Sequence, residues 1–502
     1  MSAPLFRTKG LDAILRESEA PDRRLSRMLG ATDVLLLGIG AIVGAGIFAT
    51  IGTAAAGDAA RPGAGPALIL SFVLTAVACG FAALCYAEFA AMVPISGSAY
   101  TYAYATLGEL VAWIIGWDLI IEYAVGNVAV AISWGNYFKT LMSGFGIVIP
   151  DWISTDYRTA ARIPGLLDSA PHVFGVPIVF NILAFGIVML LTVVLVVGIR
   201  ESARMNAVMV AIKLAVLAIF VAIGWQYTRT ENWTPFAPNG WAGVQAGAAI
   251  VFFAYIGFDA VSTVAEEVRD PKRDLPIGII GSLVVCTLIY IVVAVVFTGI
   301  MPYHVLVERL ATEQAEPLTM ALQYANIERW GDVVVGLVAF GSVVAHTAVL
   351  LVFQLGQPRI FFSMARDGLL PQSFAKVHPR FHTPHVATIL TGLAVGVCAM
   401  FTSIDEMVDL TNIGTLFAFV LVCLGIVILR RRDPDRPRAF RTPLVPLVPI
   451  LGMLSCGYLM LGLPAITWIR FGLWLAVGLV VYFAYGFGRS RLRQSPPGAS
   501  NP

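Results

Sequence analysis

The chain has 502 residues, of which 58% are hydrophobic and only 13% are charged. Its mean hydropathy of +0.81 lies far outside the range of water-soluble globular proteins, so the sequence predicts a membrane protein. The net charge of +2 gives no indication of nucleic-acid binding, and we expect no nucleic-acid partner.

Apolar segments of the length that crosses a bilayer recur along the whole chain. A spanning helix needs about 20 apolar residues. The sequence therefore predicts an all-α polytopic membrane protein with twelve transmembrane helices, near 31–56, 66–92, 105–141, 175–198, 203–226, 242–265, 275–300, 331–364, 385–402, 406–430, 444–466 and 468–488. The third and eighth exceed one crossing, so we expect them to be strongly tilted or to continue into the cytoplasm.

The basic residues predict the orientation. Of the 33 lysines and arginines, 24 lie in the terminal segments and in every second connection, eight lie in the remaining connections, and Lys213 lies within an apolar segment. Because cytoplasmic segments carry the excess of basic residues, we expect a multi-pass protein of the bacterial plasma membrane with both termini in the cytoplasm. We expect no cleavable signal peptide, since the first 30 residues are charged and the first apolar segment is too long.

The first apolar segment contains glycines where a spanning helix should be continuous, namely Gly38, Gly40, Gly44 and Gly46. In hydrocarbon, unwound backbone persists only where it is buried in protein or lines a cavity. Its free N–H and C=O groups can then bind a carboxylate and an ammonium. The alternative is that the glycines only let another helix pack closely.

A second interruption is predicted five segments later, where residues 252–259 read FFAYIGFD and Gly257 precedes Asp259. The two interruptions correspond if segments 1–5 and 6–10 form an inverted repeat, because five is odd and the second half then inserts upside down. The matched pair predicts a substrate site near the middle of the membrane.

Lys213 lies in NAVMVAIKLAVLAIF, with at least seven residues of the fifth segment on either side. Its ammonium is too deep to reach an interface, and burial disfavours the charged form, so we expect Lys213 to take part in proton coupling. Candidate partners are carbonyls of the interrupted first helix and the hydroxyls of Ser342 and Thr347. The alternative is a static cation paired with Asp259 or with helix carbonyls.

Other polar residues in apolar segments are candidates for a polar network or for substrate selection. Asp259 either lines the cationic end of the substrate pocket or joins Tyr290 and Lys213. Glu122 either faces the site or is a hydrogen-bonded packing residue. His346 either tunes substrate selection or is a satisfied core histidine, and we favour the core.

Few other features carry chemistry. The six cysteines lie in apolar segments without CxxC pairs, so we interpret them as small core residues and expect neither disulfides, metal nor cofactor. We place Glu88 at the start of a cytoplasmic turn. The connections 143–174 and 301–330 are the only long external ones, and neither is large enough for a soluble domain.

Six motifs carry a resemblance to a known family: GIGAIVGAGIF (38–48), YAEFAAMVPISGSAYTY (86–102), GWDLIIEY (116–123), FFAYIGFDAVSTVAEEVRDPKRDLPIGI (252–279), RIFFSMARDGLLP (359–371) and LTNIGTLFAF (410–419). Together they resemble the cationic amino acid transporter family of the amino acid, polyamine and organocation superfamily. The chain looks closest to the twelve-span, proton-coupled bacterial members.

The resemblance implies a five-plus-five inverted repeat with discontinuous helices 1 and 6, followed by two appended helices. The implied parts are a cytoplasmic N-terminal segment, two repeats, the appended helices and a cytoplasmic tail, at 1–30, 31–226, 240–430, 444–488 and 489–502.

The resemblance also implies the substrate contacts. The substrate carboxylate would meet the backbone N–H groups of Gly44, Ala45 and Gly46. The ammonium would meet carbonyls of Ile42, Phe253, Ala254 and Ile256, and Phe253 resembles the aromatic that closes over the substrate. Many relatives have Ser or Thr where this chain has Ala45, so a hydroxyl contact is lost there while backbone binding remains.

These observations predict proton-coupled uptake of L-amino acids by alternating access, either cationic ones such as arginine or lysine or small neutral ones such as alanine. The alternative is an exchanger of amino acids or polyamines. A membrane sensor or an intramembrane enzyme is disfavoured, because no catalytic motif and no signalling domain is present. The expected partners are an amino acid, protons and the lipid bilayer, with the protein as a monomer or beside a small accessory membrane protein.

Overall fold

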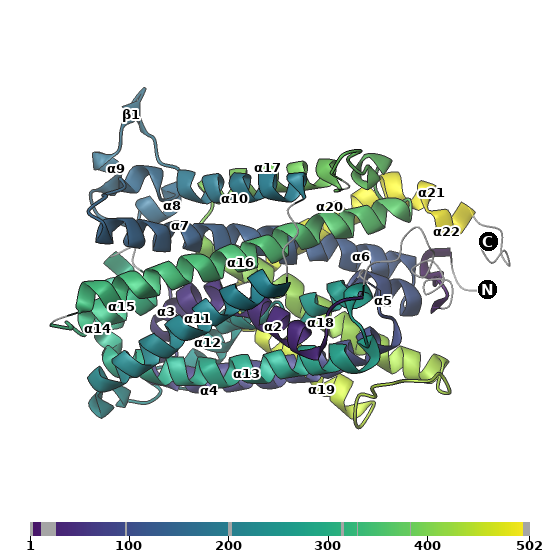
Figure 1. Cartoon of the computed structure of the whole chain (residues 1–502), viewed down its shortest axis with the longest axis horizontal. Coiled ribbons are helices and arrows are strands. Elements are labelled where there is room, and N and C mark those ends of the chain that lie inside the picture. Colours follow the sequence, from purple (N-terminus) through teal and green to yellow (C-terminus); the bar gives the residue numbers. More distant parts are fainter. Residues whose placement is uncertain are drawn as a thin grey trace.

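The computed structural model describes residues 4–11, 27–95, 98–198, 203–312, 316–328, 330–381 and 383–494. They form an elongated helical bundle (Figure 1). The first described turn (Pro4–Phe6) and the last helix, α22 (Arg491–Gln494), lie at one end, which we call the terminal end. The opposite end, the loop end, carries α9 (Leu166–Ser169), α14 (Tyr303–Thr312), α15 (Pro317–Tyr324) and a short hairpin.

Nine helical segments in the described residues are long and apolar enough to cross a membrane: Ala31–Ala56, Gly65–Met92, Glu109–Gly144, Arg204–Tyr227, Gly240–Glu267, Pro271–Ile300, Gly331–Arg366, Ile404–Arg432 and Ala465–Arg489. Three further apolar helices are shorter: α10 (Ile182–Val197), α17 (His385–Phe401) and α19 (Leu447–Met460). Nine of the twelve predicted spans are thus confirmed as helices of spanning length, and the other three coincide with shorter apolar helices.

The remaining elements have the following bounds: α2 (Ala31–Ile42), α3 (Ile51–Ala56), α4 (Leu68–Met92), α5 (Ser98–Thr106), α6 (Glu109–Ile120), α7 (Gly126–Gly144), α8 (Tyr157–Ala160), α9 (Leu166–Ser169), α11 (Ala203–Gly224), α12 (Gly240–Val251), α13 (Pro271–Ile300), α14 (Tyr303–Thr312), α15 (Pro317–Tyr324), α16 (Gly331–Arg366), α18 (Ile404–Arg432), α20 (Ala465–Val481) and α21 (Phe487–Arg489). Strand β1 (His172–Val173) pairs antiparallel with β2 (Val176–Pro177).

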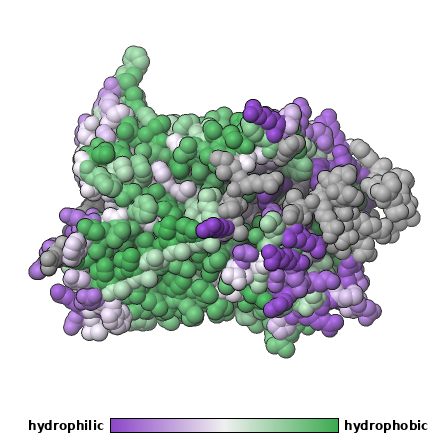
Figure 2. All heavy atoms as spheres, viewed as in Figure 1, coloured by the Kyte–Doolittle hydropathy of each residue, from purple (hydrophilic) through white to green (hydrophobic). Residues whose placement is uncertain are grey.

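A broad hydrophobic band covers the middle of the molecule, and hydrophilic residues gather at both ends (Figure 2). Large apolar side chains of the described helices are exposed, among them Leu190 of Ile182–Val197, Leu288 of Pro271–Ile300 and Leu473 of Ala465–Val481. Exposed leucines on this scale would be costly in water and are favourable against lipid chains. The surface therefore agrees with a multi-pass membrane protein.

Helices from the two halves of the chain pack in corresponding pairs. α4 packs against α13, α7 against α16, and α10 against α17. Gly65, which lies just before α4, is beside Tyr303, which follows the end of α13, so these two helices run in opposite directions. Helices α2 and α11 pack against α13 and α16, which encloses the centre of the bundle.

Three sequence predictions need correction. The third span begins at Glu109, since Gly108 has a φ of +100° and separates α6 from α5. Glu88 does not begin a turn, because α4 continues to Met92 and the side chain of Glu88 is buried. Cys398 is exposed on α17, whereas the other five cysteines are buried as predicted.

Some predictions concern residues that the structure does not describe. These predictions concern most of the N-terminal segment 1–30 and the end of the tail 489–502. They also concern two basic residues used for the orientation, Arg200 and Arg329.

Candidate functional site

The first predicted interruption is present. Helix α2 ends at Ile42, and Val43 is extended, with φ −77° and ψ 100°. A π-helical turn then begins at Gly46 and continues into α3. The first N–H groups of such a helix have no acceptor within the helix, and the helix dipole favours negative charge beside them.

The second predicted interruption is also present. Helix α12 ends at Val251 and passes through a 3₁₀ turn into Ile256, whose backbone is extended, with ψ 135°. Gly257 follows with a φ of +120°, which side chains other than glycine rarely adopt. Asp259 then starts a 3₁₀ helix that extends to Glu267.

The two interruptions touch through their backbones. A Cβ added to Gly46 would lie 2.1 Å from the Cα of Ala254, and one added to Gly257 would lie 2.8 Å from the carbonyl carbon of Ala41. The close-packing interpretation of the glycines is therefore confirmed at Gly46, where it coexists with the interruption. The predicted substrate residues of the two interruptions are buried and lie side by side. Each of the following is at most 5% exposed: Ile42, Ala45, Phe253, Ala254 and Ile256.

This contact makes a prediction about Gly46. We expect Gly46→Ala to lower the thermal unfolding midpoint of the detergent-purified protein, because its Cβ meets backbone that cannot rotate away. Overpacking of this kind costs about 1–3 kcal/mol. A matched control is Gly80→Ala in α4, where an added Cβ has open space. An unfolding midpoint for Gly46→Ala equal to that of the control would contradict the observed contact.

Lys213 lies where the sequence analysis expected it to act. Its side chain is fully buried on α11, and its Nζ donates to the carbonyl oxygens of Gly40 at 2.7 Å and Val43 at 2.9 Å. These carbonyls belong to the end of α2, where the interruption frees backbone acceptors. Lys213 thus links α11 to the first interruption.

Tyr290 also binds the end of α2. Its hydroxyl, carried by α13, donates to the carbonyl oxygen of Ile42 at 3.0 Å. A carbonyl oxygen has two lone pairs, and Tyr290 occupies one of these two acceptor positions on Ile42.

Asp259 lies with acidic rather than basic neighbours. Its Oδ1 accepts from the N–H of Gly257 at 3.3 Å, and its carboxyl interacts with that of Glu122. Among the described residues, Asp259 Oδ2 and both carboxyl oxygens of Glu122 and Asp118 have no hydrogen-bond partner. The structure therefore groups Asp259 with Glu122, a pairing that neither sequence alternative included.

Asp118 is a buried acid that the sequence analysis missed. It lies four residues before Glu122, on the same face of the third span, next to Gly414 of α18. A carboxylate repeated at a spacing of four within an apolar helix is the signal that could have found it.

His346 has two hydrogen-bond partners within the core. Its Nδ1 lies 2.6 Å from the carbonyl oxygen of Ser342, and its Nε2 lies 2.8 Å from Ser133 Oγ. Because a carbonyl only accepts, Nδ1 carries a proton. Both ring nitrogens therefore have partners, as expected of a core histidine, and a role of His346 in substrate selection stays a prediction.

The two hydroxyls proposed as partners of Lys213 make hydrogen bonds along their own helix. Ser342 Oγ donates to Val338 O, and Thr347 Oγ1 donates to Val343 O and accepts from the indole of Trp134. Both residues lie on α16, which packs against α11.

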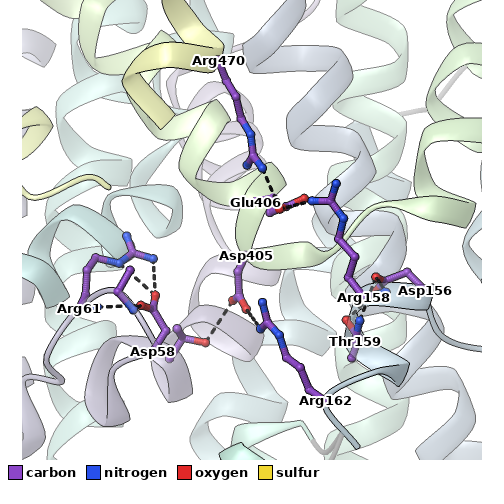
Figure 3. Close-up of polar contacts among 11 residues, drawn as sticks. Asp58, Arg61, Asp156, Arg158, Thr159, Arg162, Asp405, Glu406 and Arg470 are labelled. Carbon is purple, nitrogen blue, oxygen red and sulfur yellow. Dashed lines mark hydrogen bonds and ion pairs between the residues drawn. The ribbon is translucent and has the colours of Figure 1, made fainter. Parts of the chain in front are cut away.

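Charged residues gather at the loop end, in a set that the sequence analysis did not identify (Figure 3). Arg61 binds Asp58 and Asp409 at 2.6 and 2.7 Å, and Arg162 lies 3.9 Å from Asp405. Glu406 binds both Arg158 and Arg470. These contacts join the connection after α3, the segment around α8 and the start of α18.

The comparisons with known proteins agree with this architecture. A family model described as amino acid permease matches residues 29–483. The chain belongs to the amino acid permease family. This family is part of the amino acid, polyamine and organocation superfamily, as the sequence motifs predicted.

Individual relatives of this permease cover nearly all of its length. It is 46% identical to the branched-chain amino acid permease BcaP of Bacillus subtilis (strain 168), over 98% of this chain and 100% of the relative. It is 43% identical to the methylthioribose transporter of the same organism, over 98% and 99% of the two chains. It is 34% identical to the vacuolar cationic amino acid transporter 4 of Arabidopsis thaliana, over 86% and 68%. The permease is therefore an amino acid transporter of a membrane and not an enzyme.

Proposed function

We propose that this permease is a secondary active transporter that takes up L-amino acids by alternating access and couples uptake to protons. The observation that carries the proposal is the contact of two interrupted helices beside a buried lysine that binds one of them. The backbone N–H groups from Gly44 to Gly46 would receive the substrate carboxylate. Carbonyls of Ile42, Phe253, Ala254 and Ile256 would receive its ammonium.

We also propose the twelve-span inverted repeat. The pairing of α4 with α13, α7 with α16 and α10 with α17 supports it, because each pair joins corresponding members of the two halves. The excess of basic residues at the terminal end supports cytoplasmic termini, so the loop end would face outward.

The two ends of the bundle differ in a way that supports alternating access. At the loop end a cavity reaches Thr50, one turn beyond Gly46. At the terminal end the N–H groups of Met28 and Leu29 donate to Glu267 O, and Arg269 N–H donates to Leu29 O. A cavity next to the first interruption at one end, with backbone pairing between the segments that flank the interruptions at the other, would correspond to one state of a transport cycle.

We propose that the preferred substrate is a neutral aliphatic amino acid and not a cationic one. The side chains beside the interruptions are apolar, with Val349 against Gly44 and with Phe253 and Ile256 in the second interruption. The name of the branched-chain amino acid permease agrees with this choice. The 43% sequence identity to a methylthioribose transporter favours a second candidate function, which is the transport of a thiosugar.

Competition in proteoliposomes tests the proposal. We expect unlabelled L-leucine to reduce the uptake of labelled L-leucine strongly, L-arginine to reduce it less, and isoamylamine, which is leucine without its carboxylate, to have little effect. The reason is that an amine leaves the N–H groups of Gly44 to Gly46 without an acceptor, which costs about 1–3 kcal/mol for each unsatisfied donor. Uptake of methylthioribose without uptake of any amino acid would refute the proposal and support the second candidate.

A further inference from the structure

A cavity of about 560 Å³ opens at the loop end. Its lining includes Thr50 and Ile250, which lie close in sequence to Gly46 and Ala254 of the two interruptions. Thr50 Oγ1 donates to the carbonyl oxygen of Gly46, so a lining residue is hydrogen-bonded directly to the first interruption. The cavity therefore adjoins the proposed substrate site.

The walls of this loop-end cavity carry more acidic than basic side chains. The acidic ones are Asp58, Asp156, Glu316, Asp405 and Asp409, and the basic ones are Arg61 and Arg162. Arg61 is 7% exposed and binds Asp58 and Asp409 closely. Arg162 is more loosely held, since its side chain is 64% exposed and lies 3.9 Å from Asp405 (Figure 3).

Glu316 differs from the other acids of the cavity. It precedes α15, is 4% exposed, and among the described residues its Oε2 has no hydrogen-bond partner. Asn136 and Tyr137 of α7 are its polar neighbours. A buried carboxylate oxygen without a donor is rare in folded proteins, and one that lines a cavity is available to a ligand.

We propose that the loop-end cavity is a first binding site for a free amino acid, in which Glu316 binds the α-ammonium and Arg162 the carboxylate. The site rests on the proposed function and precedes the central site on the path of the substrate. The inference depends on the cavity, on the unpartnered oxygen of Glu316 and on the loosely paired guanidinium of Arg162.

The protonation of Glu316 sets the pH dependence of this site. Burial raises the pKa of Glu316 to about 8. The charged or titratable groups around it are Tyr137 on α7 and the six other acidic and basic side chains of the cavity. Below pH 8 the carboxyl is mostly neutral, and above it the carboxylate can bind an ammonium by charge. Affinity for the amino acid at this site should therefore increase as the pH rises through about 8.

The test is equilibrium exchange of labelled L-leucine in proteoliposomes with equal pH on both sides, at pH 6.5 and 8.5. We expect a lower KM for the wild type at pH 8.5. In Glu316→Gln the KM at pH 8.5 should rise roughly tenfold, as the loss of one charge-assisted hydrogen bond predicts, and should no longer depend on pH. The maximal exchange rate should change little, because the central site is intact.

The matched control is Glu328→Gln, which makes the same change at an exposed residue of the same connection, away from the cavity. It should retain the wild-type KM at both pH values. Arg162→Gln is a second test at an exposed residue that does not endanger folding, and its KM should also rise. Wild-type KM values in both Glu316→Gln and Arg162→Gln would overturn the inference while leaving amino acid transport intact. Absence of exchange in the wild type would refute the proposed function.

Discussion

Replacing Lys213 with alanine should abolish uptake that is driven by an inward proton gradient. The substitution removes the hydrogen bonds to the carbonyl oxygens of Gly40 and Val43, which have a charged donor in the protonated state. Bonds of this kind contribute about 1.5–3 kcal/mol each, so the balance between transport states should change more than tenfold. The measurement is concentrative uptake of L-leucine at an external pH of 5.5 against an internal pH of 7.5.

The same variant provides its own control. Lys213→Ala should still exchange internal for external amino acid at equal pH. The reason is that the lysine side chain of the wild type binds the end of α2 and not the N–H groups from Gly44 to Gly46, which would bind the substrate. If concentrative uptake kept its wild-type response to pH, Lys213 would not be the coupling residue, and the proton would be assigned to Glu122 or Asp259. A wild type that exchanges amino acids but ignores a pH gradient would support the exchanger alternative.

Replacing Glu88 with glutamine should destabilise the protein more than any other single substitution proposed for it. Glu88 is fully buried in α4 and binds Arg430 through both carboxylate oxygens, at 2.8 and 2.9 Å. Arg438 lies 3.0 Å from the same carboxylate, and Thr442 N–H donates to it at 2.8 Å. The loss of one partner from such a buried ion pair costs about 3–5 kcal/mol, because the remaining charge is not compensated.

The thermal unfolding midpoint of the detergent-purified protein measures this effect. The control is Glu406→Gln, which also removes a carboxylate that binds two arginines, Arg158 and Arg470, but at a partly exposed position. Exposed pairs contribute about 0–1 kcal/mol, so the control should change the midpoint little. Equal decreases of the unfolding midpoint in the two variants would show that the burial of Glu88 does not determine its contribution to stability.

The role of Glu88 follows from its position. Its partners belong to the end of α18 and to the connection that leads to α19, so one carboxylate fixes α4 of the first half of the chain to the second half at the terminal end. Lys213 and Glu88 therefore make their contacts in different parts of the bundle. Lys213 lies at the first interruption, whereas Glu88 holds the connection between α18 and α19 at the terminal end.

The sequence by itself determined the features that depend on the chemistry of single segments. Apolar length predicted the spans, because a helix that crosses the bilayer needs about 20 apolar residues and hydrogen-bonds its own backbone groups. Glycines predicted both interruptions, at Gly44 to Gly46 and at Gly257, because a residue without a side chain weakens a helix and tolerates a positive φ. The depth of Lys213 within its segment similarly indicated a binding partner inside the bundle.

Only the tertiary structure decided which polar groups meet. The sequence left Asp259 either at the cationic end of the substrate pocket or beside Tyr290 and Lys213. The folded chain sets it near Glu122, while Tyr290 and Lys213 bind the end of α2. The set of charges around the loop-end cavity joins Asp58 with Asp409 through Arg61, across about 350 residues of sequence. Such contacts leave no local pattern, because they depend on helices brought together by the burial of their apolar faces. Local hydropathy fixes which segments enter the membrane, whereas long-range packing fixes which charges become neighbours.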